Sequence, residues 1–241
     1  MQLKIGTWNL QGNAWNATCS TIAEAKARMI NQEFDVLCLQ ETGKMGIEGQ
    51  TLFNDPNFQL ITGVNIRTTY RKFLVNCYKY VFGDNNQRCS MAILVRSELD
   101  ANCPAIQYSS GLRPVFGVLL TNNIAVYNIH APSTGTIFSD NYDKSAIECI
   151  CHNVFDYKLN GAIIAGDFNT TPDKLRTVLD PSIKIYAPSE RNKYIATQNS
   201  GNCLDYCCVI NNNGYYIPEP QIEVSTNAAY SDHRFVRLTF N

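Results

Sequence analysis

Short apolar runs recur along this chain of 241 residues, and most are too brief to form anything but β-strands. β-Branched and aliphatic residues dominate these runs, and Gly, Asn, Asp and Pro separate them. The pattern predicts strands over residues 3–11, 35–40, 73–82, 91–95, 115–120, 124–129, 162–165, 204–210 and 235–240.

Helix signals are fewer and lie between the predicted strands. Residues 20–33 begin with Ser and Thr capping options and carry one apolar face, and residues 141–157 repeat apolar side chains at helical spacing. Pro172 starts a short helix that runs to Leu179. Because strands outnumber helices by about three to one, this mixture favours an α/β fold of two packed sheets with helices outside.

The composition is that of a folded protein with a sizeable core, at 45% hydrophobic and 17% charged residues. No linker or repeat divides the chain, so we expect a single domain over residues 1–241. No apolar run approaches the ~18 to 20 residues of a membrane span. The chain enters its first strand without a signal-peptide pattern, so it is either made without a signal or seen in a processed form with an added Met.

The net charge of −1 argues against a general nucleic-acid coat protein, whose affinity comes from many phosphate contacts. Residues 63–96 differ from the rest, because they hold six Lys and Arg against one Asp, interleaved with aromatic residues. This segment is either an arm that follows a phosphate backbone or a hairpin with a basic outer face. In the first case Arg88 is its candidate phosphate contact.

Ten cysteines are present and none forms a Cys-x-x-Cys pair, which disfavours a zinc or thioredoxin-like site. Disulfides are then the better use for some of them and indicate a protein that is secreted or passes through the periplasm. Cys77 and Cys89 flank a predicted hairpin turn and are candidates to face each other. We expect Cys38 to stay reduced inside a strand, and Cys207 and Cys208 to point to opposite faces of a sheet.

Polar residues follow several predicted strands at the point where each strand ends. These residues are Asn9, Glu41, His130, the Asp167–Asn169 pair, and the Asp232–His233 pair before the last strand. Hydrolysis of a phosphodiester needs a cation on the phosphate, a base for water, and hydrogen-bond donors for the phosphoryl oxygens. The set contains all three kinds of group, so it predicts a metal-dependent phosphodiesterase.

Glu41 is the candidate Mg²⁺ ligand, because magnesium favours one or two carboxylates together with water and substrate oxygens. Asn9 and Asp232 are expected to complete or orient the same site. Taken singly, a Glu at a strand end is usually only solvated and an Asn there more often satisfies a turn.

His233 is the candidate general base and needs a carboxylate on its far ring nitrogen. Asp205 can supply it, since a carboxylate inside an apolar strand is rarely buried without a partner. A core salt bridge or a backbone cap is the alternative role for Asp205.

Asp167 and Asn169 alternate around Phe168, which sends both polar side chains to one side. Asp167 is expected to orient the attacking water, and Asn169 to donate to a phosphate oxygen. His130 is suited to donate a hydrogen bond to the phosphate or to the leaving oxygen, and Arg113 can bind a phosphate through its planar guanidinium group. Each residue alone has an ordinary structural explanation, so the prediction depends on their joint occurrence.

These motifs together resemble the endonuclease/exonuclease/phosphatase superfamily, and within its deoxyribonuclease I-like members the nuclease subunits of cytolethal distending toxins. The segments that carry the resemblance are 7–12, 40–41, 113–117, 130–131, 166–169, 200–206 and 231–233. The resemblance implies a four-layer α-β-β-α sandwich with two mixed β-sheets. It also implies Mg²⁺-dependent cleavage, with Mn²⁺ or Ca²⁺ in support, of double-stranded DNA inside a target cell, in its nucleus.

The resemblance assigns metal binding to Glu41, with Asn9 and Asp232 nearby, and implies secretion and delivery by separate binding subunits. Phosphoinositide phosphatase activity on the same residues is the nearest alternative, and a catalytically silent toxin or binding subunit is an alternative of another class. Asn169 also lies in a glycosylation sequon, and a glycan there would block the site.

Overall fold

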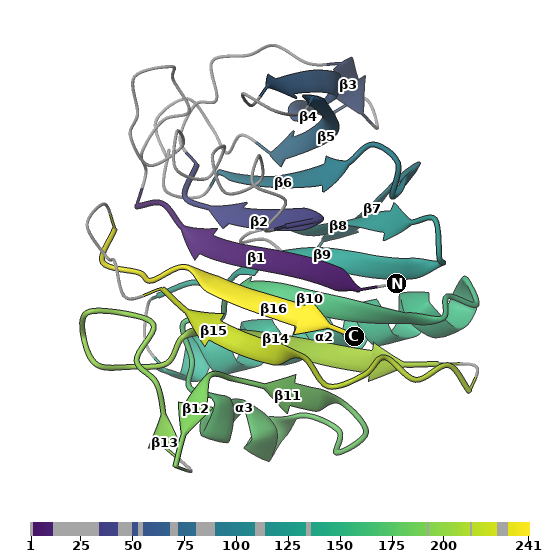
Figure 1. Ribbon diagram of the computed structural model, residues 1–241. Coiled ribbons are helices and arrows are strands. Elements are labelled where there is room, and N and C mark those ends of the chain that lie inside the picture. Colours follow the sequence, from purple (N-terminus) through teal and green to yellow (C-terminus); the bar gives the residue numbers. More distant parts are fainter. Residues whose placement is uncertain are drawn as a thin grey trace.

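The computed structural model describes residues 2–11, 34–42, 50–52, 55–67, 72–80, 90–108, 114–133, 136–191, 193–212, 214–225 and 231–241. Two β-sheets pack face to face in this part of the chain (Figure 1). The sheets are mixed, since β1 pairs in parallel with β2 but antiparallel with β16, and β10 pairs in parallel with β9 but antiparallel with β14. The predicted sandwich of two mixed sheets is therefore confirmed.

The first sheet has eight strands in the order β15-β16-β1-β2-β6-β5-β4-β3. Its strands are β1 (Leu3–Asn9), β2 (Val36–Gln40), β3 (Gln50–Leu52), β4 (Asp55–Arg67), β5 (Lys72–Tyr80), β6 (Met91–Arg96), β15 (Gln221–Val224) and β16 (Val236–Phe240). The first and last described strands of the chain thus lie side by side in the middle of the molecule (Figure 1).

The second sheet has six strands in the order β11-β14-β10-β9-β8-β7. Its strands are β7 (Asp100–Tyr108), β8 (Pro114–Leu120), β9 (Ile124–His130), β10 (Gly161–Asp167), β11 (Lys184–Tyr186) and β14 (Asp205–Asn211). Two short strands, β12 (Ser189–Glu190) and β13 (Lys193–Tyr194), pair with each other outside both sheets.

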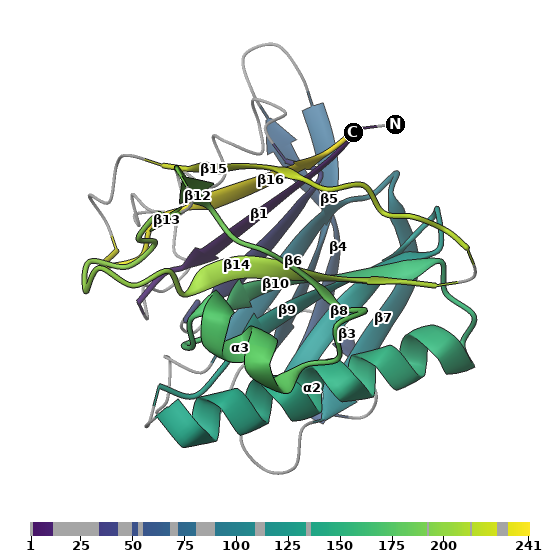
Figure 2. The same cartoon turned by 90° about the horizontal axis from the view of Figure 1, so that it is seen from below.

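Two helices, α2 (Thr136–Asp156) and α3 (Pro172–Val178), cover the outer face of the second sheet (Figure 2). Ile147 and Ile150 of α2 and Leu175 of α3 pack there in one buried cluster with β9, β10 and β14. The helix predicted over residues 20–33, which would form the fourth layer, lies outside the described residues. In the described part of the chain, no helix is long and apolar enough to cross a membrane.

Seven of the described strands were missed in the sequence, namely the short β3, β11, β12, β13 and β15 and the longer β4 and β7. The residues of the two longer strands break the usual signals. β4 contains Pro56, Asn57 and Gly63, and its register with β5 shifts between Ile61 and Val64. β7 contains Pro104, which lacks the N–H that an inner strand needs, and β7 lies at the edge of its sheet, where that loss is tolerated.

The cysteines differ in part from expectation. Cys77 is free and faces Leu94 across the hairpin, so the proposed bridge from Cys77 is wrong, while Cys89 lies outside the described residues. Cys38 is free and fully buried in the core between the sheets, as predicted. Cys207 joins that core and Cys208 joins the cluster under the helices, which confirms that they point to opposite faces.

A polar bridge joins the two sheets inside the core. The Gln40 amide donates to Asn128 Oδ1 at 2.7 Å and to Thr7 Oγ1 at 3.1 Å. The Asn128 amide in turn donates to the carbonyl oxygens of Leu39 and Ala92 at 2.9 and 3.0 Å. Gln40 and Asn128 are completely buried, so each of these groups depends on the others to replace water. The bridge fixes β2 against β9 just before Glu41.

We expect Asn128→Leu to lower the free energy of unfolding by about 2–4 kcal/mol, because it strips the donor from two buried carbonyls and leaves the Gln40 amide short of an acceptor. Urea unfolding followed by circular dichroism measures the change. Asn160→Ala is the control, since its amide bonds the Asn122 carbonyl at an exposed position, and it should cost less than about 1 kcal/mol. Equal losses for the two variants would contradict a structural role for the bridge.

Candidate active site

The inward-facing side chains of four strands change from apolar to polar at one edge of the sandwich. Along each strand alternate residues face the space between the sheets. In β1 the residues on this face are Leu3 and Ile5, which lie in the core, followed by the polar Thr7 and Asn9. In β9 and β10 the same columns end in His130 and Asp167, and β14 begins with Asp205 on that face.

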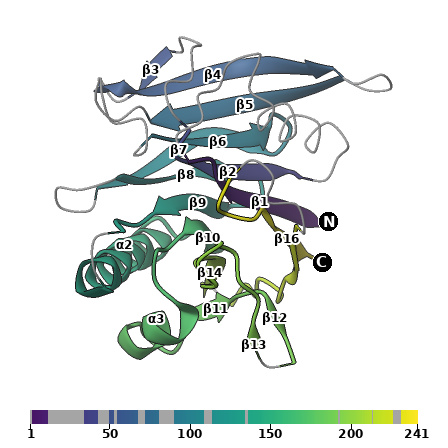
Figure 3. The same ribbon diagram turned by 90° about the vertical axis from the view of Figure 1, so that its left-hand side faces the viewer.

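Strand pairing brings these polar ends together. Asp167 is the register partner of both His130 and Asp205 in the second sheet. In the first sheet Asn9 pairs with Gln40, which places Glu41 one residue beyond. The carboxyl ends of β1 and β2 and the start of β16 lie at this same edge, on the left in Figure 1 and toward the viewer in Figure 3. Six segments of the chain therefore meet at one place, as predicted.

Asn9 connects the two sheets within this cluster. Its amide nitrogen donates to Asp167 Oδ2 at 2.9 Å and to Glu41 Oε1 at 3.3 Å. Its Oδ1 accepts from the backbone N–H of Gln11 at 3.0 Å. Asn9 and Asp167 are both about 1% exposed and Glu41 is 7% exposed, so two carboxylates are held side by side away from bulk water.

His130 lies between the same two carboxylates. Its Nε2 is 3.6 Å from Glu41 Oε1 and 3.9 Å from Asp167 Oδ2, and its side chain is 2% exposed. An imidazole N–H in this position can donate to a phosphoryl oxygen that enters the cluster.

His233 and Asp205 form a close buried pair. The ring Nδ1 of His233 lies 2.9 Å from Asp205 Oδ2 and 3.2 Å from Oδ1, and Asp205 is fully buried. The other ring nitrogen, Nε2, lies 3.7 Å from Asp167 Oδ2 and 3.6 Å from Asp232 Oδ1. Burial alone would lower the pKa of His233, but the charge and hydrogen bond of Asp205, with the charges of Asp167 and Asp232, outweigh it and raise the pKa to about 10.

The side chains of Asp167 and Asn169 lie on the same side of the chain after β10, as expected. The Asn169 backbone N–H donates to Asp167 Oδ1 at 2.9 Å, and its side-chain amide donates to the Ala131 carbonyl at 2.8 Å. Phe168 points the other way, where it stacks on Tyr206. Burial, and then the nearby charge of Asp205, raise the pKa of Asp167 to about 7, against the opposing charge of His233.

Strained backbone marks the same edge. Glu41 has φ of 50°, Asn169 has φ of 48° and Gln11 has φ of 53°, all in the left-handed region that side chains other than glycine rarely adopt. Such conformations cost about 1 kcal/mol or more each and persist where the surroundings determine them. Here the strain turns Glu41 and Asn169 toward the cluster directly after their strands end.

The chemistry of the donor set fits a hard divalent cation. The carboxylates of Glu41, Asp167, Asp205 and Asp232 gather around two imidazoles, so carboxylate groups outnumber the groups that can carry positive charge. Among the described residues, the buried Oδ1 of Asp232 has no hydrogen-bond partner. Asp167, Asp205 and His233 offer ligand atoms within 4.8 Å of one another. Asp205 and His233 already bond to each other, so the carboxylate oxygens near Glu41 are better placed to bind magnesium than this pair is.

The remaining predicted phosphate contacts are untested. Arg113 and Arg88 lie outside the described residues. The basic segment is described only in part, and within it Lys79 of β5 is buried and Arg96 of β6 pairs with Asp35 at 3.4 Å, so neither side chain extends from the surface as an arm on phosphates would require. Sequence reasoning also missed Gln198, whose side-chain amide lies 3.2 Å from His233 Nε2. Only the nearby Gly201-Asn202 turn marks that segment in the sequence.

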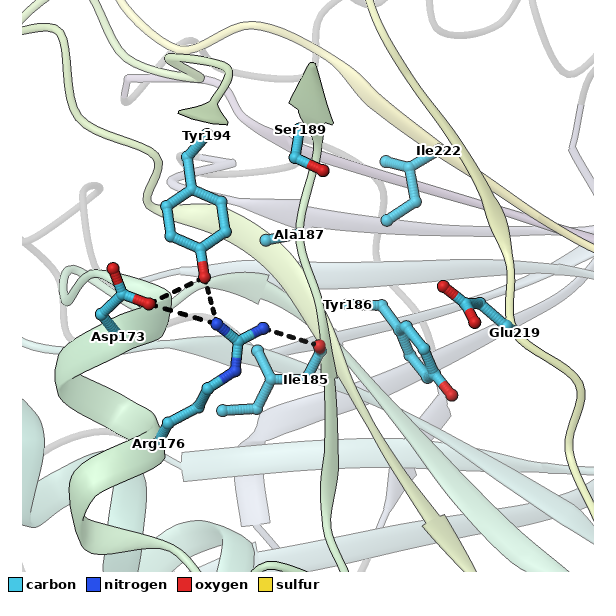
Figure 4. Close-up of a pocket in the computed structure, with 9 residues that line it drawn as sticks. All are labelled: Asp173, Arg176, Ile185, Tyr186, Ala187, Ser189, Tyr194, Glu219 and Ile222. Atoms are coloured by element: carbon cyan, nitrogen blue, oxygen red, sulfur yellow. Dashed lines mark hydrogen bonds and ion pairs between the residues drawn. The ribbon is translucent and has the colours of Figure 1, made fainter. Parts of the chain in front are cut away.

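A separate pocket of about 370 Å³ lies away from this cluster (Figure 4). Arg176 of α3 crosses its wall, where it pairs with Asp173 at 3.2 Å and contacts the Tyr194 hydroxyl. Tyr186 and Glu219 stand on its other side. The pocket contains none of the predicted catalytic residues.

The profile of the "Endonuclease/Exonuclease/phosphatase family" matches residues 6–233, which include every described residue of the cluster. The chain belongs to this family. Enzymes of the family are phosphoesterases that use divalent metal ions, and the cluster provides a candidate place for one here.

Among characterised proteins, the chain is similar to a homologue, from Salmonella typhi, of a cytolethal distending toxin subunit. The two are 26% identical over 234 residues, which cover 88% of this chain and 80% of that protein.

Solved structures share the fold. A chain of the Haemophilus ducreyi cytolethal distending toxin aligns with a TM-score of 0.74 and 24% identity, over 98% of this chain and 97% of that one. A structure described as CdtB, the biologically active subunit of cytolethal distending toxin, aligns with a TM-score of 0.79 and 21% identity, over 98% and 96%. At these identities the likeness establishes the architecture.

Proposed function

We propose that this chain is a metal-dependent phosphodiesterase that nicks double-stranded DNA, through attack on phosphorus by a water that His233 activates. The observation that carries the proposal is the position of Asp167, whose Oδ2 lies 3.9 Å from His130 Nε2 and 3.7 Å from His233 Nε2. One carboxylate thus touches the group that would bind the phosphate and the group that would take the proton. The whole of residues 1–241 would act as a single catalytic domain.

His233 Nε2 would take a proton from water while Asp205, on Nδ1, stabilises the imidazolium that forms. Asp167 Oδ2 would hold the second hydrogen of the same water and so point its lone pair at phosphorus. His130 and the Asn169 amide would donate to phosphoryl oxygens as negative charge develops there. Asn9 would keep Glu41 and Asp167 in place.

Glu41 would hold the cation, with Asn9 and Asp232 completing or orienting the site. When bound, the cation would neutralise phosphate charge and offset the carboxylate charge that raises the pKa of His233. Mg²⁺ is the proposed ion because the donor atoms at this position are oxygens.

We further propose that the chain is the active subunit of a secreted toxin, delivered by separate binding subunits and acting in the nucleus of a target cell. The support is the name of the Salmonella typhi relative, which describes a toxin subunit.

The decisive test compares two phosphate substrates. Purified protein is incubated with supercoiled plasmid or with an inositol-lipid headgroup, with Mg²⁺ or with excess chelator. We expect plasmid nicking that the chelator abolishes and added Mg²⁺ restores, and little release of inorganic phosphate from the headgroup. Faster turnover of the headgroup than of DNA would replace the nuclease by a phosphatase, and no turnover of either would point to a silent subunit.

A further inference from the structure

Gln198 touches the imidazole of His233 on the side that would accept the proton. Its amide nitrogen lies 3.2 Å from His233 Nε2, and the two residues also pair through an isolated backbone β-bridge. Because an amide nitrogen carries hydrogens and no free lone pair, it can only donate, and Nε2 is then the acceptor.

A chain of hydrogen bonds fixes which end of the Gln198 amide faces the ring. The Asn202 amide donates to Ser200 Oγ at 3.2 Å, so the Ser200 hydroxyl is free to donate onward. Ser200 Oγ lies 2.6 Å from Gln198 Oε1, which places the carbonyl end of the amide away from the ring. The donors and acceptors therefore run in one direction from Asn202 through Ser200 to Gln198.

The far side of the imidazole continues the same direction. His233 Nδ1 lies 2.9 Å from Asp205 Oδ2, and a carboxylate oxygen accepts, so the ring hydrogen stands on Nδ1. In the neutral imidazole that a base requires, a donor at Nε2 and an acceptor at Nδ1 are both satisfied only by the Nδ1–H tautomer. This is the tautomer whose Nε2 lone pair can take a proton from water.

The backbone of the same segment anchors both members of the pair. Thr197 Oγ1 accepts from the backbone N–H groups of Leu204 and Asp205, each at 2.9 Å, and Thr197 is fully buried. The Asn199 N–H donates to the Asp232 carbonyl at 2.8 Å. Gln198 is therefore held at a fixed place by its neighbours' contacts with the segments that carry Asp205 and His233.

We propose that Gln198 is a positioning residue, oriented by Ser200 and Asn202, that holds His233 in the tautomer and ring orientation needed for a base. The proposal rests on the proposed function. The contact of 3.2 Å is long for a hydrogen bond, so the attacking water displaces the amide at small cost once substrate binds. Gln198 acts through His233 and makes no bond to the reacting phosphate.

A double-mutant cycle tests this on cleavage of a fluorescent duplex oligonucleotide with Mg²⁺. Gln198→Met keeps the length of the side chain and removes the donor. We expect it to lower kcat about tenfold and to change KM less than twofold, because it affects the tautomer and orientation of His233 and not the binding of substrate. In a His233→Ala background the same change should have no further effect, because nothing is left to position. Ser200→Ala should lower kcat several-fold, and Ser200→Thr should restore it.

Gln221→Met is the matched control. Gln221 is exposed and pairs with Thr239 of β16, which in turn pairs with Lys4 at the opposite end of β1 from Asn9. The kcat of Gln221→Met should therefore equal that of the wild type. A Gln198→Met kcat within twofold of the wild type overturns the inference, and so does a further tenfold loss in the His233→Ala background. A wild-type protein without activity overturns the proposed function and this inference together.

Discussion

His233→Ala should lower the rate of Mg²⁺-dependent plasmid nicking by ~10² to 10⁴-fold, the contribution that a positioned general base makes. The variant removes a side chain that lies within 4 Å of both Asp205 and Asp167. Nicking is measured as the loss of supercoiled plasmid over time at fixed Mg²⁺.

The control for this variant is His152→Ala, which changes an exposed imidazole on α2 and should leave the rate unchanged. Circular dichroism and thermal unfolding establish that both proteins are folded. If His233→Ala nicks plasmid as fast as the wild type, His233 is not the base.

Glu41→Gln should abolish most of the rise in melting temperature that Mg²⁺ causes, because it removes a charge while it keeps nearly the same side-chain shape. The wild-type cluster holds buried carboxylates close together, so a bound cation relieves their repulsion and should raise the melting temperature in proportion to ln(1 + [Mg²⁺]/Kd). Losing the charge of Glu41 should remove most of this rise. It should also slow nicking on the order of a hundredfold or more, since metal ions contribute several kcal/mol to such reactions.

Glu190→Gln serves as the comparison, because it removes one exposed carboxylate in β12 and should keep the full Mg²⁺ response. Calorimetric titration of Mg²⁺ gives the binding constant independently of activity. An undiminished melting shift in Glu41→Gln would move the metal to another set of ligands, of which Asp167 and Asp232 are the nearest.

The sequence was enough to predict the sandwich and most of the cluster, for one physical reason. Strands of alternating side chains carry their polar ends to a common edge, so Asn9, Glu41, His130 and Asp167 were recognisable wherever an apolar run stopped. Glu41 and Asn169 stand on turns that signal a strand end in their own right. A short-range pattern was therefore sufficient for these residues.

Contacts that depend on loops were not predictable in this way. Gln198 lies in an irregular segment 35 residues before His233, and the bridge between them follows only from where the chain enters β14 and β16. β4 and β7 were missed because Pro56 and Gly63 in β4 and Pro104 in β7 resemble turn signals. The pairing of Cys77 with Leu94 is a matter of hairpin register, which no spacing of cysteines reveals.

The position of Asn9 has a consequence for how this protein can change over evolution. Because one amide ties a carboxylate of the first sheet to a carboxylate of the second, the spacing of the two layers sets the distance between the proposed metal ligand and the water-orienting group. Repacking the interior by a methyl group, far from any reacting atom, would shift that distance and so alter turnover. Tolerance to interior substitutions should therefore be lower for catalysis than for folding.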